Sequence, residues 1–169
     1  MKVSNLIILT ALISVTTFSC KNNGEATANT PAVNNDQPIE IEFLKEGELT
    51  LTNNDSIIKK LDIEIAKSNN ERAIGLMNRS SMEENQGMLF VFEQDNTSGF
   101  YMKDTRISLD IIFIGEDKKV ITITPNRQPY DTTTQGATAP YRYVLEVNGG
   151  KAEAWGIQEG VTKIDWVEM

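Results

Sequence analysis

Two carboxylates and two cations occur within or beside apolar segments, where charged side chains are rare. Asp110 lies inside the apolar run 109–114, and Glu146 lies inside a second apolar segment nearer the C-terminus. Lys103 comes directly after another apolar run, 100–102, and Arg72 begins an expected short helix. A carboxylate on an apolar strand face is costly unless it is paired or hydrogen-bonded. We therefore expect the four groups to meet in one polar cluster.

Such a cluster has two interpretations. As a catalytic site, Asp110 and Glu146 would act as general acid and base, with Lys103 or Arg72 as an electrostatic clamp on a sugar-like or acidic ligand. As a structural feature, the same groups would form a buried ion-pair network that fixes strand register, and this interpretation is favoured. The distance between the carboxyl groups of Asp110 and Glu146 would decide between the two.

The candidate binding residues are those four groups together with Met102. Together with Met88, Phe100 and Tyr101, Met102 could line an apolar ligand pocket, although alternating strand residues more often belong to the core. The sequence has no histidine and one cysteine, which excludes Ser-His and Cys-His dyads and a His-bound metal. We expect no metal and no cofactor.

The N-terminus resembles an export and lipidation signal. Residues 1–19 contain Lys2 and then an apolar run that is too short to span a membrane comfortably, as in a signal peptide. Cys20, the only cysteine, ends this run and is the expected lipidation site. A polar tether, 21–38, follows. We expect a lipoprotein in the cell envelope, on the periplasmic or surface face; an ordinary secretory signal with a chance cysteine is the alternative.

The charge balance narrows the possible partners. The chain of 169 residues carries 16 Lys+Arg against 24 Asp+Glu, a formal charge of -8. A phosphate backbone repels such a protein, so we expect no nucleic acid partner. A membrane contact would therefore go through a lipid on Cys20 rather than through surface charge.

Residues 39–169 have the pattern of a single β-rich domain. Alternating or continuous apolar runs bounded by turn residues predict strands, and Ser68 with Glu71 fits a capping box before a short helix. The fold class predicted is mainly β (α+β), a compact antiparallel barrel- or sandwich-like domain with two short helices. The expected elements are a hairpin over 39–51, strands at 61–65, 88–92, 100–102, 109–114, 120–124, 141–147 and 164–167, and helices at 72–78 and 151–155.

Several motifs, in order, resemble the domain of unknown function 192 family over roughly residue 43 to the C-terminus. They combine glycines with apolar and charged residues at fixed spacings. They are Glu71-Arg72, Gly75-Leu76-Met77, Arg79, Gly87-Met88-Leu89-Phe90, Phe92, Phe100-Tyr101-Met102-Lys103-Asp104-Thr105, Leu109-Asp110-Ile111-Ile112-Phe113, Val144-Leu145-Glu146-Val147-Asn148-Gly149-Gly150, Gly156 and Gly160. The chain departs from the family pattern at Tyr101, Asp104 and Gly149, where Trp, Asn and Ala are usual. The resemblance implies a compact β-rich domain, often exported or lipid-anchored, and implies no particular reaction.

These observations favour a non-catalytic binding or accessory module that takes a small-molecule or glycan ligand. One alternative is an acid–base enzyme that acts on a glycan through Asp110 and Glu146. The other is a structural partner of another envelope protein.

Overall fold

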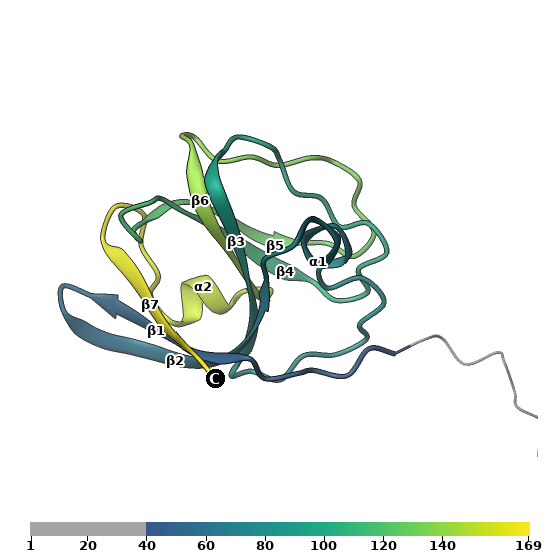
Figure 1. The fold of residues 1–169 in the computed structure, drawn as a ribbon, viewed down its shortest axis with the longest axis horizontal. Helices are drawn as coiled ribbons and strands as arrows, with labels where there is room; N and C mark the ends of the chain where they lie inside the picture. Colours follow the sequence, from purple (N-terminus) through teal and green to yellow (C-terminus); the bar gives the residue numbers. More distant parts are fainter. Residues whose placement is uncertain (1–39) are drawn as a thin grey trace, which may run out of the picture. The chain divides into compact units, whose positions relative to one another are not determined.

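The computed structural model describes residues 40–169, so the signal peptide, Cys20 and the tether predicted for 1–38 lie outside the described residues. Seven strands and two short helices make up this part of the chain (Figure 1). In chain order they are β1 (Gly47–Asn53), β2 (Ser56–Ala66), α1 (Asn69–Ile74), β3 (Gln86–Asn96), β4 (Leu109–Ile114), β5 (Val120–Arg127), β6 (Tyr141–Asn148), α2 (Lys151–Ala154) and β7 (Thr162–Glu168). The predicted class, mainly β with two short helices, is confirmed.

The strands form one sheet in the order β5-β4-β6-β3-β2-β1-β7. Neighbouring strands are antiparallel except β2 and β3, which run parallel. Parallel neighbours need a crossover connection rather than a tight turn. Here α1 and the loop after it supply that connection, a feature that alternation in the sequence did not reveal.

The sheet curls until its two edge strands touch at one end. The N–H of Gly160 donates to the carbonyl of Val120 at 2.8 Å, and the N–H of Ile164 donates to the carbonyl of Lys118 at 3.0 Å. Lys119 and Lys163 form an isolated antiparallel bridge at the same place. The sheet is therefore partly closed, as in a small barrel.

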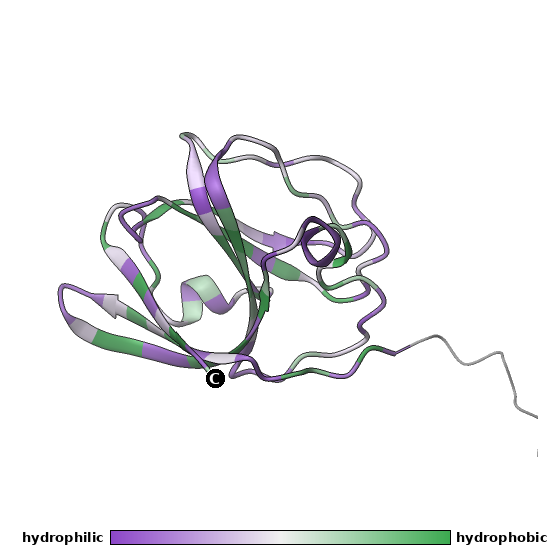
Figure 2. Cartoon of the chain, viewed as in Figure 1, coloured by the Kyte–Doolittle hydropathy of each residue, from purple (hydrophilic) through white to green (hydrophobic). Residues whose placement is uncertain are grey.

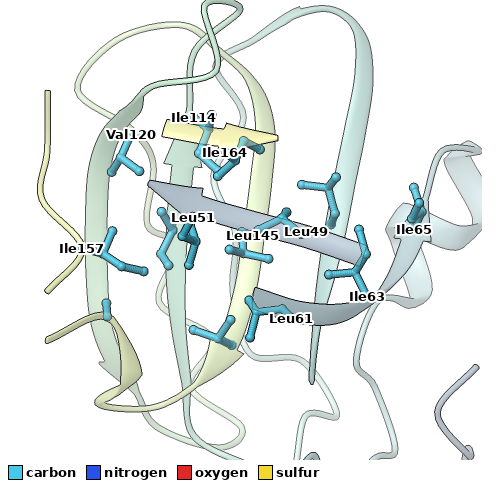
Figure 3. Close-up of a cluster of buried hydrophobic side chains, with 14 residues drawn as sticks. Leu49, Leu51, Leu61, Ile63, Ile65, Ile114, Val120, Leu145, Ile157 and Ile164 are labelled. Atoms are coloured by element: carbon cyan, nitrogen blue, oxygen red, sulfur yellow. The ribbon is translucent and has the colours of Figure 1, made fainter. Parts of the chain in front are cut away.

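Both faces of the central strands β3, β6 and β4 are buried. One face contributes to a cluster enclosed by the curled sheet and α2, whose side chains converge from opposite strands (Figure 3). The other face contributes to a second cluster with residues from the loops and from the turn after α1, including Leu76 and Met102. Colouring by hydropathy shows these central strands as largely apolar and α1 as polar (Figure 2). This explains why all six residues of β4 are buried.

The expected hairpin over 39–51 is wrong. Ile41 and Leu44 are exposed, and residues 40–46 form no strand. β1 instead forms its hairpin with β2 through a turn at 54–55, and its other edge pairs with β7. Because both edges of β1 are occupied, the upstream alternating segment has no strand with which to pair.

The predicted capping box is confirmed, and the helix begins earlier than expected. The hydroxyl of Ser68 accepts the N–H of Glu71 at 3.2 Å, while the Glu71 carboxylate accepts the N–H of Ser68 at 2.7 Å. The helix thus starts at Asn69 and ends before Gly75, whose φ of 47° favours glycine. Among residues 40–169, no helix is long and apolar enough to cross a membrane.

The strand expected at 100–102 is reduced to one bridge. Phe100 exchanges two backbone hydrogen bonds with Gln135, and the N–H of Met102 donates to the carbonyl of Asp131 at 2.9 Å. The long loop after β5 therefore holds this segment against the second core cluster, and no sheet strand pairs with it.

Candidate functional site

Asp110 is a structural residue that binds the start of α2. Its Oδ1 accepts the N–H groups of Asn126 at 2.7 Å and Gly150 at 2.9 Å, and its Oδ2 accepts that of Ala152 at 2.7 Å. The N-cap residue of α2, Gly150, has no side chain that could satisfy these donors. The fully buried carboxylate of Asp110 therefore takes the place of a capping side chain from a neighbouring strand.

Glu146 points to the opposite face of the sheet. Asp110 is paired with Val147, while Glu146 is paired with Ile111, and directly opposed residues in an antiparallel pair share a face. Val147 belongs to the enclosed cluster and Ile111 to the second one. The expectation that Asp110 and Glu146 meet in a single polar cluster is therefore wrong, because neighbouring positions in paired strands alternate between faces.

Glu146 forms the floor of a cavity between α1, the loop 97–105 and the sheet. The cavity has a volume of about 330 Å³. Its buried lining includes Glu146 together with Leu76, Phe90 and Thr105. Exposed residues at its mouth include Ala73 on α1 and Tyr101 on the loop. The volume lies at the low end of the range for small-molecule sites.

The carboxyl group of Glu146 has no hydrogen-bonding partner among the residues that the structure describes, and its side chain is nearly buried. Burial raises its pKa to about 8. The cause is desolvation, which disfavours the charged carboxylate. Glu146 is therefore mostly protonated at pH 7 and presents an O–H donor to the cavity.

Arg72 and Lys103 both line this cavity, and they differ in how many contacts each makes with the protein. The guanidinium of Arg72 donates to the carbonyl oxygens of Lys67 and Val91 and to Asn69, and lies 4.9 Å from the ring centroid of Phe92. Its hydrogen-bonding capacity is thus largely used by the protein.

Lys103 is exposed at the mouth, and within residues 40–169 its ammonium group makes no ion pair. Met102 is buried in the second core cluster and does not line the cavity, whereas its neighbours Phe100 and Tyr101 do. Of the predicted binding residues, the structure therefore brings Arg72, Lys103 and Glu146 to one cavity and separates Asp110 and Met102 from it.

A buried ion pair that the sequence analysis missed lies beside this site. The Nη2 atom of Arg79 is 2.7 Å from Oε1 and 2.6 Å from Oε2 of Glu64, and both side chains are almost fully buried. Oε1 also accepts the N–H of Leu44 at 2.9 Å. Glu64 alternates with apolar residues in β2, a pattern typical of a strand with one solvated face. Its partners Leu44 and Arg79 lie 20 and 15 residues away in the chain, so its burial has no local signal in the sequence.

Register places Glu64 and Glu146 in one row across the sheet. Glu64 is paired with Met88 on β3, and Met88 is paired with Glu146 on β6. Two strand spacings separate the two acids, about 10 Å. Glu64 is paired with its own cation, Arg79. Among residues 40–169, no group of three or more acidic, cysteine or histidine residues is arranged to hold a metal.

The fold and the site define a class: small β-rich domains with a cavity against one face of a curled sheet. Residues 49–165 match the model of the DUF192 family, described as "Uncharacterized ACR". The chain belongs to this family. No curated protein matches it.

Two solved structures are similar to the chain. A Novosphingobium aromaticivorans DSM 12444 protein of unknown function is 37% identical, with a TM-score of 0.67, over 70% of this chain and 84% of that chain. A Sinorhizobium meliloti 1021 protein, described as a candidate transcription regulator, is 29% identical, with a TM-score of 0.69, over 76% of this chain and 98% of that chain. Both likenesses extend over most of the β-rich domain.

Proposed function

We propose that this protein is a non-catalytic module of the cell envelope that binds a small organic molecule or a glycan fragment in the cavity above Glu146. One observation carries the proposal. Glu146 is a nearly buried carboxyl group without a hydrogen-bonding partner among residues 40–169, at the floor of a cavity lined by aromatic side chains. Buried polar groups are normally satisfied, and an unsatisfied one in a cavity is well suited to a ligand.

Binding is a better interpretation than acid–base catalysis. A glycosidase-type mechanism needs two carboxyl groups that face the same bond. Asp110 lies on the other face of the sheet, and its oxygens accept three backbone N–H groups. Within the part of the chain that the structure describes, no second carboxylate lines the cavity to act with Glu146. The paired mechanism through Asp110 and Glu146 therefore has no geometric support.

The envelope location rests on the sequence. The apolar run before Cys20, the position of that cysteine and the polar tether after it support a lipid anchor. A net charge of -8 opposes contact with a phosphate backbone.

The test is a screen of neutral, acidic and basic small molecules, including glycans and peptidoglycan fragments, by thermal shift and ligand-observed NMR. Ala73 is exposed on α1 at the cavity mouth, so Ala73→Trp should obstruct entry without altering the core. We expect this substitution to lower the affinity for any ligand that binds in the cavity at least tenfold.

Ala154→Trp is the matched control, because Ala154 is an exposed alanine in the other short helix and does not line the cavity. It should leave the affinity unchanged. A ligand that binds Ala73→Trp and wild type equally would place binding elsewhere. A screen without any ligand would also contradict the proposal.

A further inference from the structure

The charges around the cavity differ in sign from those of the whole chain. Three charged or ionisable groups other than Tyr101 line it, namely Arg72, Lys103 and Glu146. With Glu146 protonated, the lining carries two positive charges in a protein whose formal charge is -8. A locally positive cavity in an acidic protein selects for an anion by charge complementarity.

The two cations are not equivalent for a ligand. Arg72 already donates to two backbone carbonyls and to Asn69. Lys103 has no ion pair within the described part of the chain and lies exposed at the mouth. A ligand anion is therefore best placed at the mouth beside Lys103, where it remains partly hydrated. Burying it at the apolar floor would cost much more.

The floor and walls suit a different part of the same ligand. Leu76, Phe90, Phe92 and Phe100 offer apolar and aromatic surface, and below them the protonated Glu146 offers one O–H donor. A ligand that fills the cavity thus has an apolar or ring-shaped body with a hydrogen-bond acceptor at its inner end. A sugar hydroxyl, an ether or an amide oxygen would serve as this acceptor.

We propose that the cavity binds small organic monocarboxylates, with the carboxylate at Lys103, the body against the phenylalanines and an acceptor oxygen at Glu146, and that binding requires the proton on Glu146. This inference rests on the proposed function and specifies its ligand class. Ionised Glu146 would lose its donor and would repel the ligand's negative charge. Affinity for the anion should therefore fall as the pH rises above the pKa of Glu146.

Other ionisable groups around Glu146 do not account for such a pH dependence. On β2, Glu64 is neutralised by Arg79. On β4, the side chain paired with Glu146 is Ile111, and Asp110 lies on the opposite face. β3 contributes Met88 and Phe90 to this face. Apart from Glu146, the ionisable groups that line the cavity among residues 40–169 are thus the cations Arg72 and Lys103 and the phenol of Tyr101, which lies exposed at the mouth.

The experiment uses the purified protein and three probes with one body: 3-(4-methoxyphenyl)propionate, 3-(4-methoxyphenyl)propanol and 3-(4-methoxyphenyl)propylamine. Calorimetric titrations are run at pH 6.5, 7.5, 8.5 and 9.5, with circular dichroism as a check of folding at each pH. The propionate should bind most tightly at pH 6.5 and weaken roughly thirtyfold by pH 9.5, since each pH unit above the pKa costs about tenfold. The propylamine should show the opposite trend.

Two variants separate the roles of the two charged groups. Glu146→Gln keeps a donor and cannot ionise, so it should bind the propionate with no dependence on pH. Lys103→Gln should lower the affinity for the propionate about fivefold at every pH, because an exposed ion pair contributes modestly. It should not change the affinity for the alcohol. Asp110→Asn, on the other face of the sheet, should not alter the pH dependence.

The ligand class is overturned by tighter binding of the amine at pH 6.5. The ligand class is also overturned if Lys103→Gln leaves the affinity for the propionate unchanged, or if the pH dependence persists in Glu146→Gln. Absence of binding of every probe at millimolar concentration would overturn it as well. If another compound from the broad screen binds and Ala73→Trp abolishes that binding, the cavity function stands while the carboxylate assignment fails.

Discussion

At the scale of single residues, two carboxyl groups on neighbouring strands have opposite environments. Asp110 is completely buried and accepts three backbone N–H groups, which compensate for its lost hydration. Glu146 is nearly as buried and has no such donors within the described residues, so burial raises its pKa to about 8. Whether the lost hydration of a buried carboxyl group is compensated therefore depends on the N–H donors that face it, and the residue type alone does not predict this.

The raised pKa of Glu146 predicts a dependence of stability on pH. Between pH 4.5 and about 8 the folded protein holds this proton more tightly than the unfolded chain does. The contribution of Glu146 to the free energy of unfolding is therefore largest below pH 4.5 and is lost as the pH rises through 8. The gap between the two pKa values corresponds to no more than about 5 kcal/mol.

Glu146→Gln should remove this pH-dependent contribution to the free energy of unfolding, because an amide does not titrate. Urea unfolding of both proteins at pH 5, 6, 7, 8 and 9 measures it. The variant should gain stability relative to wild type by a few kcal/mol from pH 5 to 8, with no further change above. A constant difference across the series would show that Glu146 titrates near its ordinary pKa.

At the scale of elements, the four-residue helix α2 depends on a strand. Its first N–H groups are satisfied by Asp110 of β4, and Ala152 packs into the enclosed cluster. A helix this short is not stable alone, so its place follows from these contacts.

Asp110→Asn should destabilise the fold by about 2 to 3 kcal/mol, because one oxygen acceptor becomes an NH₂ group that faces buried N–H donors. Chemical denaturation would show a lower midpoint with an unchanged slope. Glu153→Gln is the control, since Glu153 is an exposed acid in the first turn of the same helix. Equal stability of the two variants would contradict the capping role of Asp110.

α1 shows how far element-level prediction succeeds. Its capping box was predicted from Ser68 and Glu71 because that signal is local. The strand 109–114 was predicted with its exact bounds, since a continuous apolar run flanked by turn residues is also local. The hairpin over 39–51 failed because pairing depends on which strand edges are free, and both edges of β1 are taken.

At the scale of the whole molecule, a folded domain of the DUF192 family follows the N-terminal segment in which we predict a lipid anchor. Cys20→Ala should release the protein from the membrane fraction and abolish incorporation of a radiolabelled fatty acid. Ser19→Ala is the control, because it keeps a small residue before the cysteine. Membrane association and labelling that persist in Cys20→Ala would refute the anchor.

The sequence by itself determined the β-rich class, the capping box, most strand positions and the family. These follow from periodicity, turn residues and motif order, which are readable along the chain. Only the tertiary structure decided that Asp110 and Glu146 face opposite sides of the sheet, that Glu64 is buried with Arg79, and that β2 and β3 run parallel. Each of these depends on which strands become neighbours and on what covers each face, and those long-range choices are made by packing.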